Sequence, residues 1–295
     1  MSENNDETIV KNIVISGGGI GGFTFYGAIK QLNIDGVWNI DNIDNIYGTS
    51  IGSMVGVMLS LKYSWGELDD YILKRPWQRV FKLDFSIFLN AIEKRGIFDQ
   101  KVMYETIGPL LLGKGLDQNI TMKELFDFTG INCHIICTEL HTMNLINISH
   151  STHPDWKLID AIYCSCALPI VFSPFSFNNN YYCDGGFVSN CPIDICIESG
   201  NLPNETICVG FGSTVNLYND TSSSLNLFDY ILTLLYNLIN FVNKQNNKIP
   251  LFKEIYFDPS NDIFHNIYDC ISDMTYRKKL IDIGIEKIKN ISDTI

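Results

Sequence analysis

Residues 43–53 read Ile-Asp-Asn-Ile-Tyr-Gly-Thr-Ser-Ile-Gly-Ser, and the expected fold is built outward from them. The apolar positions before Gly48 predict a short buried strand, and the run from 51 to 59 predicts an apolar helix. Between the two, Gly48, Ser50 and Gly52 form the pattern G-x-S-x-G, which is typical of a sharp strand-to-helix turn that exposes a serine hydroxyl. The glycines let strand and helix approach with no Cβ between them, and the helix start directs free N–H groups toward the serine.

A similar strand-to-helix turn lies earlier in the chain. Residues 9–16 are mostly apolar and β-branched, which predicts a buried parallel strand. They lead into residues 17–22, Gly-Gly-Gly-Ile-Gly-Gly, whose free N–H groups can cradle an anion. Three of these glycines also satisfy the G-x-G-x-x-G pattern of dinucleotide-binding folds, with Asp41 or Asp44 near the distance of a ribose partner. The residues of this turn leave both interpretations open.

Strand and helix patterns continue to alternate downstream, which indicates an α/β fold. Residues 181–186 read Tyr-Tyr-Cys-Asp-Gly-Gly and predict a strand that ends in Asp184. The segment 71–98 is different, because it carries six basic and two acidic residues, and Trp77, Phe81, Phe85 and Phe88 are interleaved with them. This pattern is typical of an interfacial lid that contacts a membrane, although the aromatic rings of such a segment more often pack into a core.

Composition excludes several classes of function. The chain has 295 residues, a net charge of −12 and a pI of about 4.8, so we expect it to bind no nucleic acid. The nine cysteines contain no C-x-x-C pair, and no carboxylate cluster resembles a calcium loop, so we expect neither a metal nor another cofactor. The first residues are polar and acidic, and no apolar run reaches the ~18 residues of a membrane span. We therefore expect a cytoplasmic protein without a signal peptide or transmembrane helix, peripheral at membranes if 71–98 contacts them.

The motifs, taken together and in their order along the chain, resemble the patatin-like phospholipase family. The likeness covers roughly residues 10 to 213. It is carried by five short motifs: Gly17-Gly18-Gly19-x-x-Gly22, Gly48-x-Ser50-x-Gly52, Cys164-Ser165-Cys166-Ala167-Leu168-Pro169, Asp184-Gly185-Gly186 and Asn190-Cys191-Pro192.

The resemblance implies a fold and a division of the chain. The implied fold is a three-layer α/β/α sheet with helices on both faces and a helical C-terminal extension. Residues 1–8 would be a disordered tail, and residues 9–213 the catalytic domain, with a helical, lid-like insert at 63–128. Residues 214–295 would form the C-terminal extension, packed on the core.

The resemblance also implies a serine–aspartate dyad that hydrolyses lipid esters. By position, Ser50 matches the nucleophile of the family and Asp184 matches its partner. Three glycines match the oxyanion hole, and five more support the motifs: Gly17, Gly18 and Gly19, and then Gly22, Gly48, Gly52, Gly185 and Gly186. The chemistry is coherent, because ester hydrolysis needs a nucleophile, a proton acceptor and donors for the developing oxyanion. The expected substrate is a phospholipid, a lysophospholipid or another acyl lipid.

One position departs from the family pattern. Many members carry lysine or arginine where this chain has Gly21, next to the oxyanion loop. The departure bears on the preference for anionic head groups more than on the dyad.

Three other functions remain open at this point. The first is a lipid- or membrane-binding protein with the same fold and little or no turnover. The second is a dinucleotide-binding enzyme that uses the glycine loop. The third is a Ser–His–Asp hydrolase, in which one of five histidines would lie against Ser50: His134, His141, His150, His153 or His265. We expect no histidine there.

Overall fold

The computed structural model describes most of the chain. The described ranges are 8–82, 91–212, 227–243, 249–258 and 267–292. Several sequence predictions fall outside them: the tail up to residue 7, Phe85, Phe88 and His265.

The centre of the fold is a mixed sheet of eight strands. These are β1 (Asn12–Ile15), β2 (Asn45–Thr49), β4 (Asn132–Glu139), β5 (Asn144–Ile148), β7 (Phe175–Phe177), β8 (Asn180–Asp184), β9 (Thr206–Phe211) and β10 (Lys253–Phe257). The order across the sheet is β10-β9-β1-β2-β4-β8-β7, with β5 also paired to β4. The first five strands in this order are parallel, whereas β5 and β8 run antiparallel to β4. A parallel sheet needs cover on both faces, which agrees with the apolar runs in its strands.

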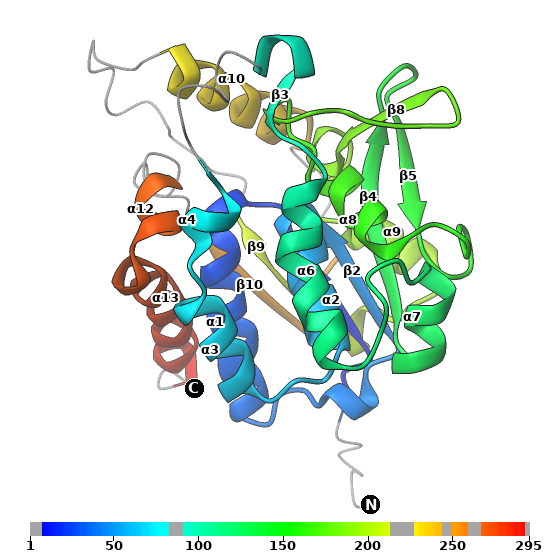
Figure 1. Cartoon of the computed structure of the whole chain (residues 1–295). Helices are drawn as coiled ribbons and strands as arrows, with labels where there is room; N and C mark the ends of the chain where they lie inside the picture. The colour runs from blue at the N-terminus through cyan, green and yellow to red at the C-terminus, as the bar shows by residue number, and fades with distance from the viewer. Residues whose placement is uncertain (1–7, 83–90, 213–226, 244–248, 259–266, 293–295) are drawn as a thin grey trace, which may run out of the picture.

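Helices lie on both faces of the sheet, as predicted (Figure 1). They are α1 (Gly22–Ile34), α2 (Ile51–Ser60), α3 (Trp65–Lys74), α4 (Trp77–Val80), α6 (Lys101–Gly113), α7 (Met122–Thr129), α8 (Leu158–Cys166), α9 (Ile193–Glu198), α10 (Leu227–Val242), α12 (Ile267–Ser272) and α13 (Met274–Ser292). Alternate residues of a strand face opposite sides. In β1, Ile13 and Ile15 belong to the large core with α1 and α2, whereas Val14 packs in a smaller cluster with Ile193 and Cys196 of α9.

The C-terminal helix α13 packs along α1 (Figure 1). Two glycines allow the backbones to touch. A Cβ on Gly27 would lie 2.1 Å from the carbonyl oxygen of Ile281, and a Cβ on Gly284 would lie 2.1 Å from that of Thr24. Any larger residue at either position would push the helices apart.

The C-terminal region is joined to the core in a second way, because β10 extends the central sheet beside β9. The predicted helical extension therefore contains a sheet strand as well as α10, α12 and α13.

The described parts of the segment 71–98, residues 71–82 and 91–98, pack largely against their own chain. Trp77 and Phe98 are buried in one cluster, and Phe81 packs against it. Arg75 lies over the rings of Tyr71 and Trp77 and donates a hydrogen bond to the Glu105 carbonyl. A short second sheet, β3 (Gly96–Phe98) with β6 (Ile170–Phe172), ties the segment to the main domain.

Candidate active site

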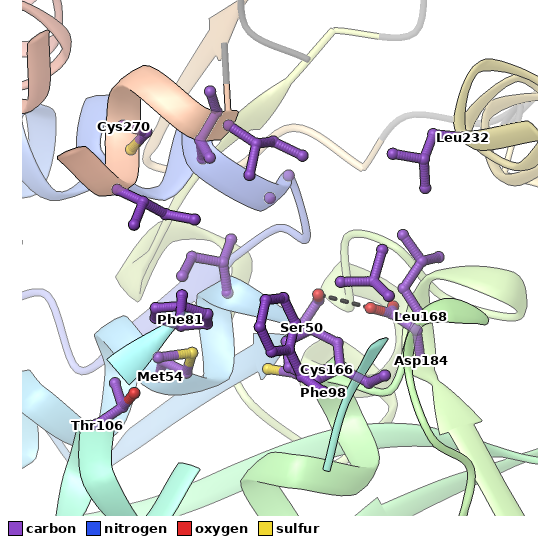
Figure 2. Close-up of a pocket in the computed structure, with 18 of the residues that line it drawn as sticks. Ser50, Met54, Phe81, Phe98, Thr106, Cys166, Leu168, Asp184, Leu232 and Cys270 are labelled. Atoms are coloured by element: carbon purple, nitrogen blue, oxygen red, sulfur yellow. Dashed lines mark hydrogen bonds between the residues drawn. The ribbon is translucent and has the colours of Figure 1, made fainter. Parts of the chain in front are cut away.

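The register of the sheet brings the two predicted dyad residues together. Thr49, the last residue of β2, pairs with Ile136 of β4, and Asp184, the last residue of β8, pairs with Cys137. Because Ile136 and Cys137 are consecutive, the end of a parallel strand and the end of an antiparallel strand meet at one point. The Ser50 Oγ donates a hydrogen bond of 2.6 Å to the Asp184 Oδ2 (Figure 2).

Ser50 occupies a strained backbone conformation, with φ of 54° and ψ of −127°. Residues other than glycine rarely adopt a positive φ, and backbone strain of this kind is concentrated at functional sites. The turn is tight because Gly52 packs against β1, where a Cβ would lie 2.3 Å from the Ile15 carbonyl oxygen. Likewise, a Cβ on Gly48 would lie 2.6 Å from the backbone of Gly52. These contacts are the physical reason for the G-x-S-x-G pattern.

Asp184 is buried, with 4% of its surface exposed. Burial raises the pKa of its carboxyl group to about 6, and hydrogen bonds from the Ser50 hydroxyl and the Gly186 N–H lower it in part. The Gly186 N–H donates to Oδ1 at 2.7 Å, which leaves Oδ2 directed at the serine. A carboxyl group with a pKa near 6 is deprotonated at pH 7 and is basic enough to accept a proton in catalysis.

The glycine loop also lies at Ser50. Gly18 and Gly19 line the cavity in front of the serine. The Gly17 N–H is already used, because it donates to the Asn190 carbonyl at 2.8 Å. The N–H groups of Gly18 and Gly19 donate no hydrogen bond to any residue in the described ranges. These two groups are therefore available to a bound molecule.

The other predicted glycines lie where space is limiting. A Cβ on Gly22 would lie 2.1 Å from Ile51 Cγ1, and one on Gly185 would lie 2.2 Å from the Ile136 carbonyl oxygen. Gly21 departs from the family pattern, and here the ring of Phe211 occupies the neighbouring space, 2.3 Å from an ideal Cβ. A long cationic side chain at position 21 would require this ring to move.

Sequence reasoning did not assign a role to Ser165 or Asn190, although both lie in motifs that it quoted. The Ser165 Oγ accepts the Ser50 N–H at 2.8 Å and donates to the Ile136 carbonyl, which fixes the turn to β4. Asn190 holds the glycine loop through the Gly17 N–H, and its Nδ2 donates to the Ser16 hydroxyl. Their hydrogen bonds cross more than 100 residues of sequence, so spacing gave no signal of them.

Asn243 directly follows α10, and the sequence predicted no role for it. Its Nδ2 donates to the Gly186 carbonyl at 2.7 Å, and its Oδ1 accepts the Asn190 N–H at 2.6 Å. One side chain therefore bridges the aspartate loop and the residue that holds the glycine loop. It lies beyond the region of family likeness, where no motif could point to it.

We predict that Asn243→Asp lowers kcat for a soluble ester roughly tenfold while KM changes little, because one bridging hydrogen bond of about 1.4 kcal/mol is lost. The variant keeps the acceptor for Asn190 but replaces the donor to Gly186 with an acceptor. The added negative charge should also move the pH profile of kcat upward.

Steady-state kinetics of both proteins from about pH 5 to 9, a pH range chosen to include the titration of a carboxyl group with a raised pKa, would measure this effect. The matched control is Asn237→Asp, which adds the same charge six residues earlier, within α10, and should leave kcat unchanged. Equal effects of the two variants would indicate a general charge effect and contradict a positioning role for Asn243.

A largely apolar cavity of about 280 Å³ opens at Ser50. Asp184 is the only charged side chain among the described residues that line it. Figure 2 shows Met54, Phe81 and Thr106 on one side of the serine and Leu168 near the aspartate on the other. The insert contributes Trp77, Phe81, Phe98, Met103 and Thr106, and the C-terminal region contributes Leu232, Tyr236, Ile239, Ile267, Cys270 and Ile271. Such a cavity suits a hydrocarbon chain.

The histidines within the described ranges are engaged elsewhere. His134 stacks on Tyr47 with ring centroids 4.0 Å apart, and burial lowers its pKa to about 4. His150 stacks on Phe126, and His141 and His153 lie against Tyr181 and Trp156. None of the four lines the cavity, and His265 lies outside the described residues. The Ser–His–Asp alternative thus finds no support among the four described histidines.

The topology also argues against the dinucleotide alternative. Asp41 and Asp44 precede β2, so they lie at the amino edge of the parallel sheet, whereas the glycine loop follows β1 at the carboxyl edge. A ribose partner must lie at the same edge as the loop that holds the pyrophosphate. In this chain the carboxyl end of β2 carries Ser50 instead.

Two other kinds of site are absent from the described residues. No group of three or more His, Cys, Asp or Glu side chains there could hold a metal ion. In the same residues, no helix has the length and hydropathy needed to cross a membrane.

Comparison with known proteins identifies the family. The family model described as patatin-like phospholipase matches residues 13–197. The chain belongs to the patatin-like phospholipase family. This patatin-like chain is 29% identical over 195 residues to "Probable lipid hydrolase 463L" of Invertebrate iridescent virus 6, and the match covers 66% of each protein.

Two further comparisons cover different shares of the chains. The patatin-like chain is 28% identical over 218 residues to "Lysophospholipase NTE1" of Scheffersomyces stipitis, which covers 72% of this chain and 12% of that protein. The crystal structure of VipD from Legionella pneumophila aligns with a TM-score of 0.42 and 15% identity, over 92% of this chain and 67% of VipD. The predicted family and fold class are confirmed.

Proposed function

We propose that this protein is a lipid acyl hydrolase that cleaves carboxylic esters of phospholipids or lysophospholipids through Ser50 and Asp184. Membership of the patatin-like phospholipase family supports a lipid hydrolase. The observation that carries the finer proposal is the 2.6 Å hydrogen bond from the Ser50 Oγ to the Asp184 Oδ2 at an apolar cavity. It supplies a nucleophile and a base in direct contact, beside space for an acyl chain.

In the first step, Ser50 attacks the ester carbonyl carbon. The Oγ proton passes to the Asp184 Oδ2 as the new C–O bond forms, and the carbonyl oxygen becomes an oxyanion. The N–H groups of Gly18 and Gly19, both at the cavity, would donate to that oxyanion, while Gly17 anchors the loop through Asn190. This assignment narrows the predicted oxyanion hole from three glycines to two.

In the second step, the tetrahedral intermediate collapses and the ester's alcohol leaves. Asp184 returns the proton to the leaving oxygen, and the acyl group stays on Ser50. A water molecule then attacks the acyl-enzyme, and Asp184 accepts a proton from it. As the bond between the acyl carbon and the Ser50 Oγ breaks, Asp184 passes this proton to the Oγ, which releases the fatty acid and restores the free serine. The apolar lining holds the acyl chain throughout both steps.

The proposal is tested by acyl transfer from defined esters. The protein is mixed with p-nitrophenyl esters of several chain lengths and with phosphatidylcholine and its lyso form, with and without EDTA. We expect hydrolysis that EDTA leaves unchanged, and mass spectrometry of the quenched reaction should locate the acyl group on Ser50. No hydrolysis at any chain length would favour the alternative of a catalytically weak or inactive lipid-binding protein.

The pH dependence follows from the aspartate. Because the base must be deprotonated, kcat/KM should rise with pH through about 6 and level off above it. Below the pKa the rate should fall about tenfold per pH unit. The measurement is kcat/KM for a soluble ester from pH 4.5 to 8, a window set by the ordinary carboxyl range. A profile that is flat through pH 6 would contradict a buried carboxylate base.

A further inference from the structure

Helix α10 has two apolar faces that point in opposite directions. At 100° per residue, Leu232, Tyr236 and Ile239 share one side of the helix, and these three line the cavity at Ser50. On the opposite side lie Tyr230, Leu234, Leu238 and Phe241, which we call the outer face of α10. Figure 2 shows Leu232 reaching toward the cavity from α10, across from Cys270 of α12.

The outer face is exposed although it consists of large hydrophobic and aromatic side chains. The exposed fractions are 57% for Tyr230, 46% for Leu234, 47% for Leu238 and 78% for Phe241. Isolated apolar residues on a surface are common, but four in successive turns of one helix form a continuous stripe. A stripe of this kind marks an interaction site. It lies on the same helix that lines the cavity at Ser50, which links this interaction site to the cavity.

The absence of charge on the outer face of α10 restricts the kind of partner that it can bind. The run from Tyr230 to Val242 contains no charged side chain, in a chain with a net charge of −12. Such a stripe has no means of attracting anionic head groups and can gain binding energy only by removing apolar area from water. This excludes recognition that depends on salt bridges.

We propose that the outer face of α10 docks the protein on the surface of a neutral or zwitterionic lipid assembly. The inference rests on the proposed lipid substrate, because docking through the cavity wall delivers acyl chains from the assembly to Ser50. The side chains insert among the acyl chains while the inner face of the same helix stays on the cavity. Binding then depends on apolar insertion and is insensitive to ionic strength.

This surface differs from the basic segment 71–98 that the sequence suggested for membrane contact. In that segment Lys74 pairs with Asp70, Lys94 pairs with Asp99, and Arg75 and Arg95 lie over aromatic rings. Four of the six cations of this segment therefore have partners within the molecule. Binding through the basic segment would be strengthened by anionic lipid and weakened by salt, whereas binding through the outer face of α10 would respond to neither.

The test measures binding of Ser50→Ala protein to phosphatidylcholine vesicles by cosedimentation, so that turnover cannot alter the vesicles. We expect binding that is unchanged by about 0.5 M NaCl and not improved by anionic lipid. The variant Leu238→Ser/Phe241→Ser, which alters two exposed positions, should lower partitioning about tenfold or more. The control pair Leu112→Ser/Phe128→Ser changes side chains exposed by 58% and 48% on α6 and α7 and should bind as the parent does.

The same substitutions in the active protein separate this inference from the proposed function. We expect the α10 pair to lose hydrolysis of vesicle lipid and to keep hydrolysis of a short soluble ester. If neither substrate is hydrolysed while vesicle binding still depends on α10, the proposed function fails and the docking surface stands.

Three results would overturn the docking surface. In the first, the α10 pair binds vesicles as well as the parent does. In the second, the parent binds only vesicles that contain anionic lipid, and salt abolishes this binding. In the third, the parent sediments as a dimer and the α10 pair sediments as a monomer. The second result would favour segment 71–98, and the third would assign the outer face to a second copy of the chain.

Discussion

Asp184→Asn is expected to lower kcat/KM for ester hydrolysis by roughly 10²- to 10⁴-fold, the contribution of a positioned general base. The amide is nearly isosteric, but its single oxygen can accept only one of the two hydrogen bonds that the carboxylate accepts, the one from the Gly186 N–H or the one from the Ser50 hydroxyl proton. It cannot take that proton as the new bond forms. The loss should therefore appear in kcat, with little change in KM, when both are measured on a soluble ester.

The same substitution is expected to stabilise the folded protein at neutral pH. Burial raises the carboxyl pKa from 3.8 to about 6, so the folded state binds the proton more tightly than the unfolded chain. Above pH 4 the unfolded chain loses this proton first, and the cost to stability grows until about pH 6. A shift of this size corresponds to about 2 to 3 kcal/mol, a cost that the neutral amide avoids.

Denaturant unfolding of both proteins at pH 4 and pH 8 would measure the difference, since the stability gain of the variant should appear only at the higher pH. Asp160→Asn is the matched control. Burial also raises the pKa of Asp160, but this residue does not line the cavity. Its substitution should leave kcat/KM within about twofold. Substantial activity in Asp184→Asn would remove the aspartate from the proposed mechanism.

Ser50→Ala and Ser50→Gly are both expected to reduce hydrolysis by at least about 10⁴-fold, because neither offers a nucleophile. They should differ in stability. The backbone at position 50 has a φ of 54°, which alanine tolerates poorly and glycine adopts readily. We therefore expect the glycine variant to be more stable than the alanine variant by about 1 kcal/mol.

Hydrolysis assays, acyl-adduct mapping and denaturant unfolding would be run on the two variants in parallel. Ser53→Ala is the control variant, because Ser53 is a nearby buried serine that does not line the cavity and whose hydroxyl donates to the Ser50 carbonyl. Turnover within tenfold of the parent in Ser50→Ala would contradict the nucleophile assignment. Equal stabilities of the alanine and glycine variants would contradict backbone strain at this turn.

Much of the candidate site could be predicted because its motifs are local. A strand that must turn sharply into a helix needs glycine at Gly48 and Gly52, and those contacts lie within ten residues of Ser50 or on the adjacent strand. The aspartate motif is local in the same way, since the Gly186 N–H donates to the Asp184 carboxylate two residues earlier. Local constraints of this kind leave a pattern that can be recognised in sequence.

The parts that sequence missed depend on long-range contacts. Asn243 meets Gly186 across 57 positions, and Gly27 meets Ile281 across most of the chain. The segment 71–98 illustrates the same limit, because composition alone could not distinguish a lid that meets lipid from rings that pack in a core. Its Trp77 is 8% exposed, whereas the stripe on α10 is open.

By itself the sequence determined the strand-to-helix turn at Ser50, the glycine loop, the aspartate motif and the family, since each depends on backbone geometry over a few residues. Only the tertiary structure decided that Asp184 lies 2.6 Å from Ser50, that the Gly17 N–H is occupied, and that α10 lines the cavity with one face and exposes the other. The physical reason is that these contacts depend on sheet register and helix packing, which the whole chain fixes together.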